Sequence, residues 1–415
     1  MGAMTDVTLP LAAEFPAATE DDWRDAVRGV ILKGRPDATD DEFAAAFVRQ
    51  LVHITPDGIP IEPLYTAGPE PDAATRGART GPWEIRQRVW AGVDGSSAVA
   101  ELESGATGVL IELPGASADT LDQTLTGVHL NLAPVSLATP ADDDGVAAAH
   151  LLIDLWERSG TPLAERAGTL GADPIGAWAR TGGRTDLDAA HRALAELVDR
   201  LTDHPAGVRA YVSDGTLWHE AGATPVQELA WTIAAAVATV RAVPALATGG
   251  TPRIEFRWAA DVDQFMTIAK LRAARQLWSR VAAAGLSPDH ATAFHAADGS
   301  RAMLTRYDTW TNALRSTVAC FAAGVGGADA VTVWPHDALL TLGGSPLGRR
   351  IARNTQTILQ SESNLWRVRD MAGGSWYVET LTAQLAEKAW SEIQTIDGLG
   401  GLIDAVHQGH VHSRL

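Results

Sequence analysis

Short β-prone runs alternate with longer segments of helical periodicity from about residue 81 onward, a pattern typical of βα units around a parallel sheet. We predict strands at residues 84–90, 108–113, 127–131, 168–171, 208–213, 253–259, 291–295 and 330–334. We predict helices at residues 96–102, 116–124, 145–157, 186–202, 224–241, 263–284, 308–322 and 346–360. Eight strands, each followed by a helix over about 280 residues, favour a (β/α)8 (TIM) barrel over an open doubly wound sheet.

The segments on either side of the predicted barrel have a different texture. Residues 1–80 are rich in Ala, Asp, Glu and Pro, and helical patterns at 21–32 and 40–51 precede a Pro/Gly-rich extended stretch. After the barrel, the motif at residues 372–378 leads into a predicted helix at 381–396. The sequence therefore predicts an N-terminal arm over 1–80, the barrel over 81–365 and a C-terminal helical extension over 366–415.

Composition and charge exclude several classes of function. A hydrophobic share of 46% and a charged share of 20% indicate a folded α/β protein rather than a disordered chain. With 33 basic and 51 acidic residues, the net charge of −18 disfavours nucleic acid and anionic membranes as partners. The single cysteine, Cys320, cannot form an intramolecular disulfide, and no apolar run is long enough to span a bilayer. These features predict a cytoplasmic protein.

Generic motifs for chemistry are weak. Carboxylates and histidines such as Asp173, Asp214 and His219 follow predicted strands, where a barrel carries its catalytic groups, but their ordinary role is in caps and loops. The chain lacks the HExxH metal motif and the GxxxxGK[ST] phosphate loop. Glycines 343 and 344 precede a helix that carries Arg349, Arg350 and Arg353. This arrangement allows an anion site at the start of the helix, although a solvated basic face is favoured.

Longer segments resemble a known family. They are PLYT at 63–66, PWEIRQ at 82–87, EAGA at 220–223, DQFMTIAKLRA at 263–273, RRIARNTQ at 349–356 and GGSWY at 373–377. In this order they resemble the methylmalonyl-CoA mutases, which are adenosylcobalamin-dependent carbon-skeleton isomerases. The resemblance implies a (β/α)8 barrel that takes coenzyme A along its axis and is normally followed by a flavodoxin-like cobalamin domain. We expect that domain to be absent from this chain, which stops at Leu415.

The residues that carry catalysis in the family are replaced here. Catalytic members read RPWTIRQYAG and SGYHMQEAGA, with an arginine near the substrate, a tyrosine beside the adenosyl–cobalt bond, and a tyrosine and a histidine around the reacting centre. This chain has Gly81, Arg88, Thr216 and Leu217 at those four positions. Leucine cannot donate the hydrogen bond that the family histidine gives to the thioester carbonyl, and His219, two residues further on, is not expected to replace it. We therefore expect no catalytic, cofactor-binding or metal-binding residue in this chain.

These losses are those of the small subunits of heterodimeric bacterial methylmalonyl-CoA mutases. The resemblance implies an inactive subunit that stabilises a homologous catalytic large subunit, with adenosylcobalamin and acyl-CoA bound by that partner. The expected reaction of the heterodimer is succinyl-CoA/methylmalonyl-CoA isomerisation in propionyl-CoA metabolism. The alternative is a catalytic acyl-CoA mutase barrel that uses cobalamin from another chain.

Charged residues inside the predicted strands add one inference of a different kind. Parallel barrel strands are normally buried on both faces, yet these carry Arg86, Glu112, Arg209, Glu255 and Arg257. Buried charges must be paired, so we predict that several of them form an ionic layer inside the barrel, closing it to a pantetheine arm. The alternative is that they lie at strand ends and reach solvent.

Overall fold

The computed structural model contains two compact units, which divide between Ala67 and Gly68. The first unit holds two helices and a short hairpin, and the second holds an eight-stranded sheet with its helices. The structure describes residues 18–35, 37–70, 72–75, 77, 79–93, 97–138, 143–247, 253–286 and 290–415. None of the helices in these ranges has the length and apolar character that a membrane crossing requires.

The N-terminal unit is built on two capped helices, α1 (Glu20–Ile31) and α2 (Asp40–Leu51), as the sequence predicts. Each begins after a threonine, Thr19 or Thr39, that forms a capping box with an acidic residue three positions later. The apolar faces of the helices meet in a small core of Leu32, Phe43 and Phe47. An antiparallel hairpin follows, formed by β1 (His53–Ile54) and β2 (Pro60–Ile61).

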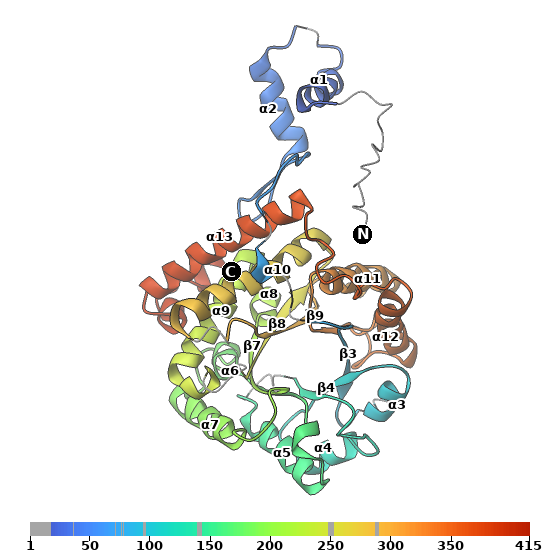
Figure 1. Ribbon diagram of the computed structural model, residues 1–415, viewed down its shortest axis with the longest axis vertical. Coiled ribbons are helices and arrows are strands. Elements are labelled where there is room, and N and C mark those ends of the chain that lie inside the picture. Colours follow the sequence, from blue (N-terminus) through green and yellow to red (C-terminus); the bar gives the residue numbers. More distant parts are fainter. Residues whose placement is uncertain are drawn as a thin grey trace, which may run out of the picture. The chain divides into compact units, whose positions relative to one another are not determined.

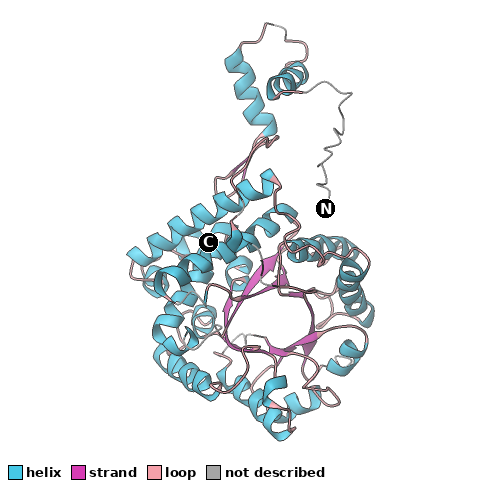
Figure 2. Ribbon diagram, viewed as in Figure 1, coloured by secondary structure: helices cyan, strands magenta, loops and turns pink. Residues whose placement is uncertain are grey.

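Eight parallel strands form a ring in the second unit (Figure 2). Hydrogen bonding follows chain order from β6 to β10, and β10 pairs with β3, which continues to β4 and β5. The strands are β3 (Glu84–Trp90), β4 (Gly108–Glu112), β5 (Val135–Leu137), β6 (Gly168–Ala172), β7 (Val208–Asp214), β8 (Ile254–Ala260), β9 (Phe294–Gly299) and β10 (Ala330–Thr332). The predicted (β/α)8 barrel is confirmed.

The ring closes where β5 meets β6. The Val135 amide donates to the carbonyl oxygen of Ala167 at 3.1 Å, and the Thr169 amide donates to Ser136 Oγ at 3.1 Å. The backbones come so close at Gly168 that a Cβ there would lie 1.8 Å from the Val135 carbonyl oxygen. Its φ of +134° also disfavours any residue with a side chain. Closure of the barrel therefore requires glycine at this position.

Helices surround the ring (Figure 1). Those that follow barrel strands are α3 (Ala98–Glu103), α4 (Ala118–Thr124), α5 (Val146–Arg158), α6 (Pro174–Arg180), α7 (Leu187–Arg200), α8 (Thr216–Glu220), α9 (Pro225–Ala242), α10 (Gln264–Gly285), α11 (Thr309–Val325) and α12 (Pro346–Ser361). The C-terminal extension contributes α13 (Trp376–Gly398), which packs against α9 and α10, and α14 (Leu402–His407). Short 3-10 helices are η1 (Ala73–Thr75), η2 (Leu163–Glu165), η3 (Pro244–Ala247) and η5 (His412–Arg414).

Two predicted strands are placed differently by the structure. The strand predicted at 127–131 is wrong, because that segment forms turns in which the Val128 amide donates to Leu125 and the Leu132 amide to His129. The third barrel strand is β5, which starts after Pro134 and is buried on both faces. The strand predicted at 291–295 overlaps β9 only at its start. Ser96, the first residue of the predicted helix 96–102, lies outside the described residues.

Candidate functional site

A buried ionic layer crosses the barrel interior. Arg86 of β3 donates from Nη1 to both carboxylate oxygens of Glu255 on β8 at 3.0 Å, and both side chains are fully buried. Arg257 Nη2 donates to Glu255 Oε1 at 2.8 Å, and the Thr169 hydroxyl donates to Oε2 at 2.6 Å. Arg209 donates from Nε to the Thr169 hydroxyl at 2.9 Å and lies 3.9 Å from Glu255. We call these five residues the lower layer, and the predicted ionic layer is confirmed.

The electrostatics of the lower layer depend on Glu255. Burial alone would raise the pKa of this carboxyl, but the guanidinium groups of Arg86, Arg257 and Arg209 outweigh it and hold the pKa well below its usual range. Burial likewise opposes the charge on Arg86, yet its carboxylate partners raise the pKa of this guanidinium. The lower layer is therefore charged, with three arginines around one carboxylate.

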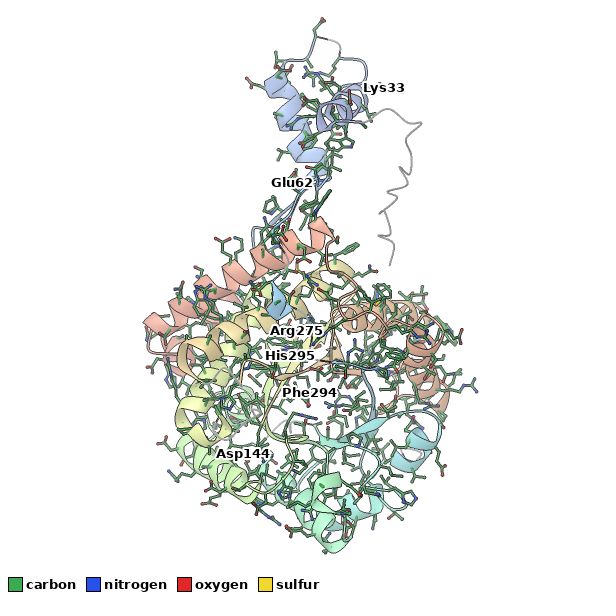
Figure 3. The ribbon with its side chains drawn as sticks, in the orientation of Figure 1. Lys33, Glu62, Asp144, Arg275, Phe294 and His295 are labelled. Carbon is green, nitrogen blue, oxygen red and sulfur yellow. The ribbon has the colours of Figure 1, made fainter. Side chains whose placement is uncertain are left out.

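The ring of Phe294 on β9 completes this level of the interior. The guanidinium carbon of Arg209 lies 3.8 Å from the ring centroid and that of Arg86 lies 5.5 Å from it. Successive strand residues point to opposite faces, so an inward Phe294 places His295 on the outside of the barrel. Figure 3 shows this arrangement, with Phe294 toward the interior and His295 toward Arg275 of α10. Side chains therefore fill the axis at this level.

A second group of charges lies nearer the C-terminal ends of the strands. Arg88, two residues after Arg86 and on the same face of β3, pairs with Glu112 of β4 and Asp298 of β9. Its guanidinium carbon lies 4.3 Å from the ring centroid of Trp334. Burial raises the pKa of Asp298, although Arg88 opposes this shift. We call Arg88, Glu112, Asp298 and Trp334 the upper layer.

The charges of the two layers balance. Four arginines meet four carboxylates when Glu84, whose Oε1 accepts from Arg86 Nε at 2.9 Å, is included with the acids of both layers. Charges taken out of water are tolerated only when partners replace the lost hydration. The charged interior is therefore a self-consistent packing solution for this barrel.

Above the upper layer lies a cavity of about 310 Å³, which we call the mouth cavity. It is lined by Arg88, Glu112, Ala138, Arg180, Asp214, Thr216, Leu217, Glu220, Arg257, Asp298, Gly299, Arg301 and Trp334. At its edge Arg180 donates to Asp173 at 3.2 Å and to Asp214 at 3.3 Å. Burial raises the pKa of Asp173 to about 6 against the attraction of Arg180. The acids and bases of this edge thus hold one another.

Three of the four substituted family positions meet in the mouth cavity. Arg88, Thr216 and Leu217 line it together, and the Thr216 hydroxyl donates to Asp214 Oδ1 at 2.6 Å. Gly81 precedes β3 at the opposite end of that strand, where its carbonyl oxygen accepts from Arg79 Nη1 at 2.8 Å. The mouth therefore holds a salt-bridged arginine, an engaged hydroxyl and an apolar side chain at three positions where the resemblance implies reactive groups.

His219 belongs to a separate buried network rather than to the lining of the mouth cavity. Its Nε2 lies 2.7 Å from Ser300 Oγ, and its Nδ1 lies 3.6 Å from the carboxylate of Glu228. Glu228 is fully buried and also pairs with Lys270. The Glu228–Lys270 pair was not predicted from the sequence. The available signal was a charged residue among the apolar residues of each long helix, α9 and α10.

Two further expectations concerned ions. Arg349 and Arg353 of α12 are buried and both pair with Glu101 of α3, so neither the solvated basic face nor a free anion site describes this pair. Within the described ranges, no three side chains of His, Cys, Asp or Glu are grouped as a metal ion would require.

The fold and site define a parallel (β/α)8 barrel whose axis is filled by paired charges below a polar mouth. The methylmalonyl-CoA mutase family matches residues 84–415. The chain is 42% identical over 443 residues to the methylmalonyl-CoA mutase small subunit of Streptomyces virginiae, covering 100% of this chain and 69% of that protein. It is 38% identical over 431 residues to the methylmalonyl-CoA mutase small subunit of Propionibacterium freudenreichii subsp. shermanii, covering 98% and 66%.

A methylmalonyl-CoA mutase of Cereibacter sphaeroides is 31% identical over 410 residues, covering 86% of this chain and 57% of that protein. The chain belongs to the methylmalonyl-CoA mutase family. It spans about two thirds of the length of the two small subunits.

Proposed function

We propose that this chain is the non-catalytic small subunit of a heterodimeric methylmalonyl-CoA mutase. In this role it stabilises a homologous large subunit, which isomerises methylmalonyl-CoA and succinyl-CoA in the cytoplasm during propionyl-CoA metabolism. The similarity to two proteins named as small subunits supports the assignment. For this subunit we propose an arm over 1–80, a barrel over 81–365 and a C-terminal extension over 366–415; the compact units of the structure divide earlier, between Ala67 and Gly68.

The lower layer is the observation that carries this proposal. An extended pantetheine arm along the axis must displace Arg86, Glu255 and Phe294, which are linked to one another and largely removed from solvent. Separating one buried ion pair costs roughly 3–5 kcal/mol. In the lower layer several guanidinium groups share the carboxylate of Glu255, so more than one such interaction would be lost. Binding of acyl-CoA in the manner of the family is therefore opposed by the packing itself.

The mouth supports the same conclusion. Leu217 offers no donor to polarise a thioester carbonyl, and the hydroxyl of Thr216 is engaged by Asp214. The residues present do not fit adenosylcobalamin: the position beside the adenosyl–cobalt bond holds Arg88 in two ion pairs. The C-terminal His407 packs edge-on against Trp178, with ring centroids 5.4 Å apart. We therefore assign cobalamin and acyl-CoA to the partner.

Exposed apolar side chains provide a surface for such a partner. On and before α11 they are Tyr307, Trp310 and Leu314, of which Trp310 is 59% and Leu314 is 71% exposed. Trp310 stacks on His336, with ring centroids 4.6 Å apart, and so joins this face to the loop after β10. That loop and the start of α12 expose Leu340, Leu342 and Leu347. Large aromatic residues are enriched at protein interfaces.

A catalytic barrel that borrows cobalamin from another chain is the second candidate. The mouth cavity of about 310 Å³ favours it, because it leaves space at the end of the barrel where the family carries its chemistry. The two candidates differ in whether turnover depends on residues of this mouth.

The test compares this chain alone, the large subunit alone and the complex, each supplied with adenosylcobalamin and methylmalonyl-CoA. We expect no succinyl-CoA from this chain alone, and unchanged turnover of the complex carrying Thr216→Val or Leu217→Ala in this chain. We also expect the large subunit to unfold at a lower temperature without its partner. Turnover by the isolated chain, or loss of complex activity in both mouth variants, contradicts the proposal.

A further inference from the structure

A second polar cavity lies outside the barrel wall, at the N-terminal ends of β9 and β10. It encloses about 230 Å³ between these strands, α10 and η1, and we call it the outer cavity. The polar and charged side chains that line it include His295 of β9, Asp329 before β10, Arg275 and Ser279 of α10, and Arg369 after α12. It shares no lining residue with the mouth cavity.

The protonation of His295 in this cavity is fixed by its neighbours. Trp258 Nε1 lies 3.0 Å from His295 Nδ1, and an indole N–H can only donate. Nδ1 must therefore be the acceptor, and Nε2 carries the proton of the neutral ring. Burial and the nearby Arg275 lower the pKa of His295 well below its usual value, so the ring stays neutral. Its Nε2–H has no hydrogen-bond partner among the described residues, although the side chain is only 2% exposed.

Arg275 supplies a charge without a paired carboxylate. Its guanidinium donates to the carbonyl oxygens of Thr75 at 2.8 Å, Gly326 at 2.5 Å and Gly327 at 3.3 Å. In the described part of the chain it forms no ion pair, and it is only 8% exposed. Burial lowers the pKa of Arg275 to about 10, although the attraction of Asp329 opposes this shift. A buried cation at a cavity wall favours an anion inside the cavity.

Three further lining residues of the outer cavity are polar or charged: Arg369, Ser279 and Asp329. Arg369 donates from Nε to the Gly77 carbonyl oxygen at 3.2 Å, and Ser279 makes no side-chain hydrogen bond within the described ranges. The one carboxylate of the cavity, Asp329, already accepts from the His295 amide at 2.8 Å. The charged side chains of the lining are therefore two arginines, Arg275 and Arg369, and one carboxylate, Asp329.

We propose that the outer cavity binds a small oxyanion, a phosphate or carboxylate group, on the Nε2–H of His295, the hydroxyl of Ser279 and the guanidinium of Arg369, in the field of Arg275. The site lies outside the barrel axis and involves none of the residues of the mouth cavity. It gives the chain a ligand of its own, independent of acyl-CoA.

The test is calorimetric titration of the full chain with inorganic phosphate and, in a separate arm, with acetate, both at constant ionic strength. Ser279→Leu fills the cavity from a helix that accepts leucine readily, and Arg369→Gln removes an exposed cation. The matched control is Arg367→Gln, two residues away, whose guanidinium lies over Trp366. Thermal unfolding of each variant establishes that it is folded.

We expect saturable binding of at least one anion to the wild type and to Arg367→Gln, at least fivefold weaker binding to Arg369→Gln, and none to Ser279→Leu. Saturation by phosphate alone assigns a phosphate site, and saturation by acetate alone assigns a carboxylate site. The proposal is overturned if neither anion gives a saturable signal, or if folded Ser279→Leu and Arg369→Gln bind as tightly as the wild type.

Discussion

Replacing Glu255 by glutamine tests whether the lower layer holds the barrel together. The substitution keeps the shape of the side chain but removes the carboxylate that contacts Arg86, Arg257 and Thr169. Glu84, bound to Arg86 Nε at 2.9 Å, then remains as the ion-pair partner of Arg86. The interior of the barrel is left with an excess of positive charge.

The magnitude follows from burial. Removing one partner of a buried ion pair costs roughly 3–5 kcal/mol, because the remaining charge loses its compensation. The glutamine oxygen still accepts one hydrogen bond, so we expect a loss of about 3 kcal/mol in the free energy of unfolding. Because the pKa of Glu255 is lowered in the folded state, its contribution is present above the unfolded value of about 4.3 and is lost as the pH falls further. The difference in free energy of unfolding between the wild type and Glu255→Gln therefore becomes smaller below about pH 4.

Urea unfolding followed by tryptophan fluorescence at pH 7 and at pH 3.5 measures both effects. The matched control is Glu112→Gln in the upper layer, where the side chain is 29% exposed and Arg88 keeps its bond to Asp298. In this control variant the free energy of unfolding should fall by about 1 kcal/mol or less. If Glu255→Gln loses no more than the control at pH 7, the ionic layer does not stabilise the barrel and the reasoning is refuted.

Two further stability predictions concern barrel closure and the edge of the mouth. Gly168→Ala should lower the free energy of unfolding by more than about 3 kcal/mol or prevent folding, because its Cβ would meet the Val135 carbonyl oxygen. The control Gly160→Ala, with φ +68° and open space around its Cβ, should lower the free energy of unfolding in urea by only about 1–2 kcal/mol. Equal losses in the two variants would contradict the closure argument. Asp173 has a folded pKa of about 6, so its stabilising contribution is complete below about pH 4 and is lost as the pH rises through 6. On going from pH 7 to pH 4, the free energy of unfolding of the wild type should therefore rise relative to that of Asp173→Asn by on the order of 2 kcal/mol. If the difference in free energy of unfolding between the two proteins does not change with pH, the pKa of Asp173 is not raised.

The sequence predicts those parts of the molecule that local pattern determines. The strand at 84–90 matches β3 in both bounds, because it contains the β-prone residues Ile85, Val89 and Trp90 and is followed by a turn at Gly92. Charged residues in buried strands were enough to predict an ionic layer, since they require partners. The strand at 127–131 is misplaced because an apolar alternation also suits a turn, and only pairing with β4 selects Val135–Leu137. The Glu101–Arg349 pair joins residues 248 positions apart, which no local pattern indicates.

Under the proposed non-catalytic role, the two layers also determine what it would take to give this barrel mutase activity. Arg86 and Arg88 are two residues apart on one face of β3, so each forms part of a separate charged level with partners from other strands. Introducing a histidine at Leu217 restores a donor at the mouth, but the lower layer still blocks the path by which a thioester would reach it. Replacing Glu255 alone removes the carboxylate that Arg86 and Arg257 both contact, which destabilises the barrel instead of opening it. Emptying the axis without loss of stability therefore requires Arg86, Arg209, Glu255 and Arg257 to change together. Under the proposed non-catalytic role, a single substitution at the mouth should not give turnover.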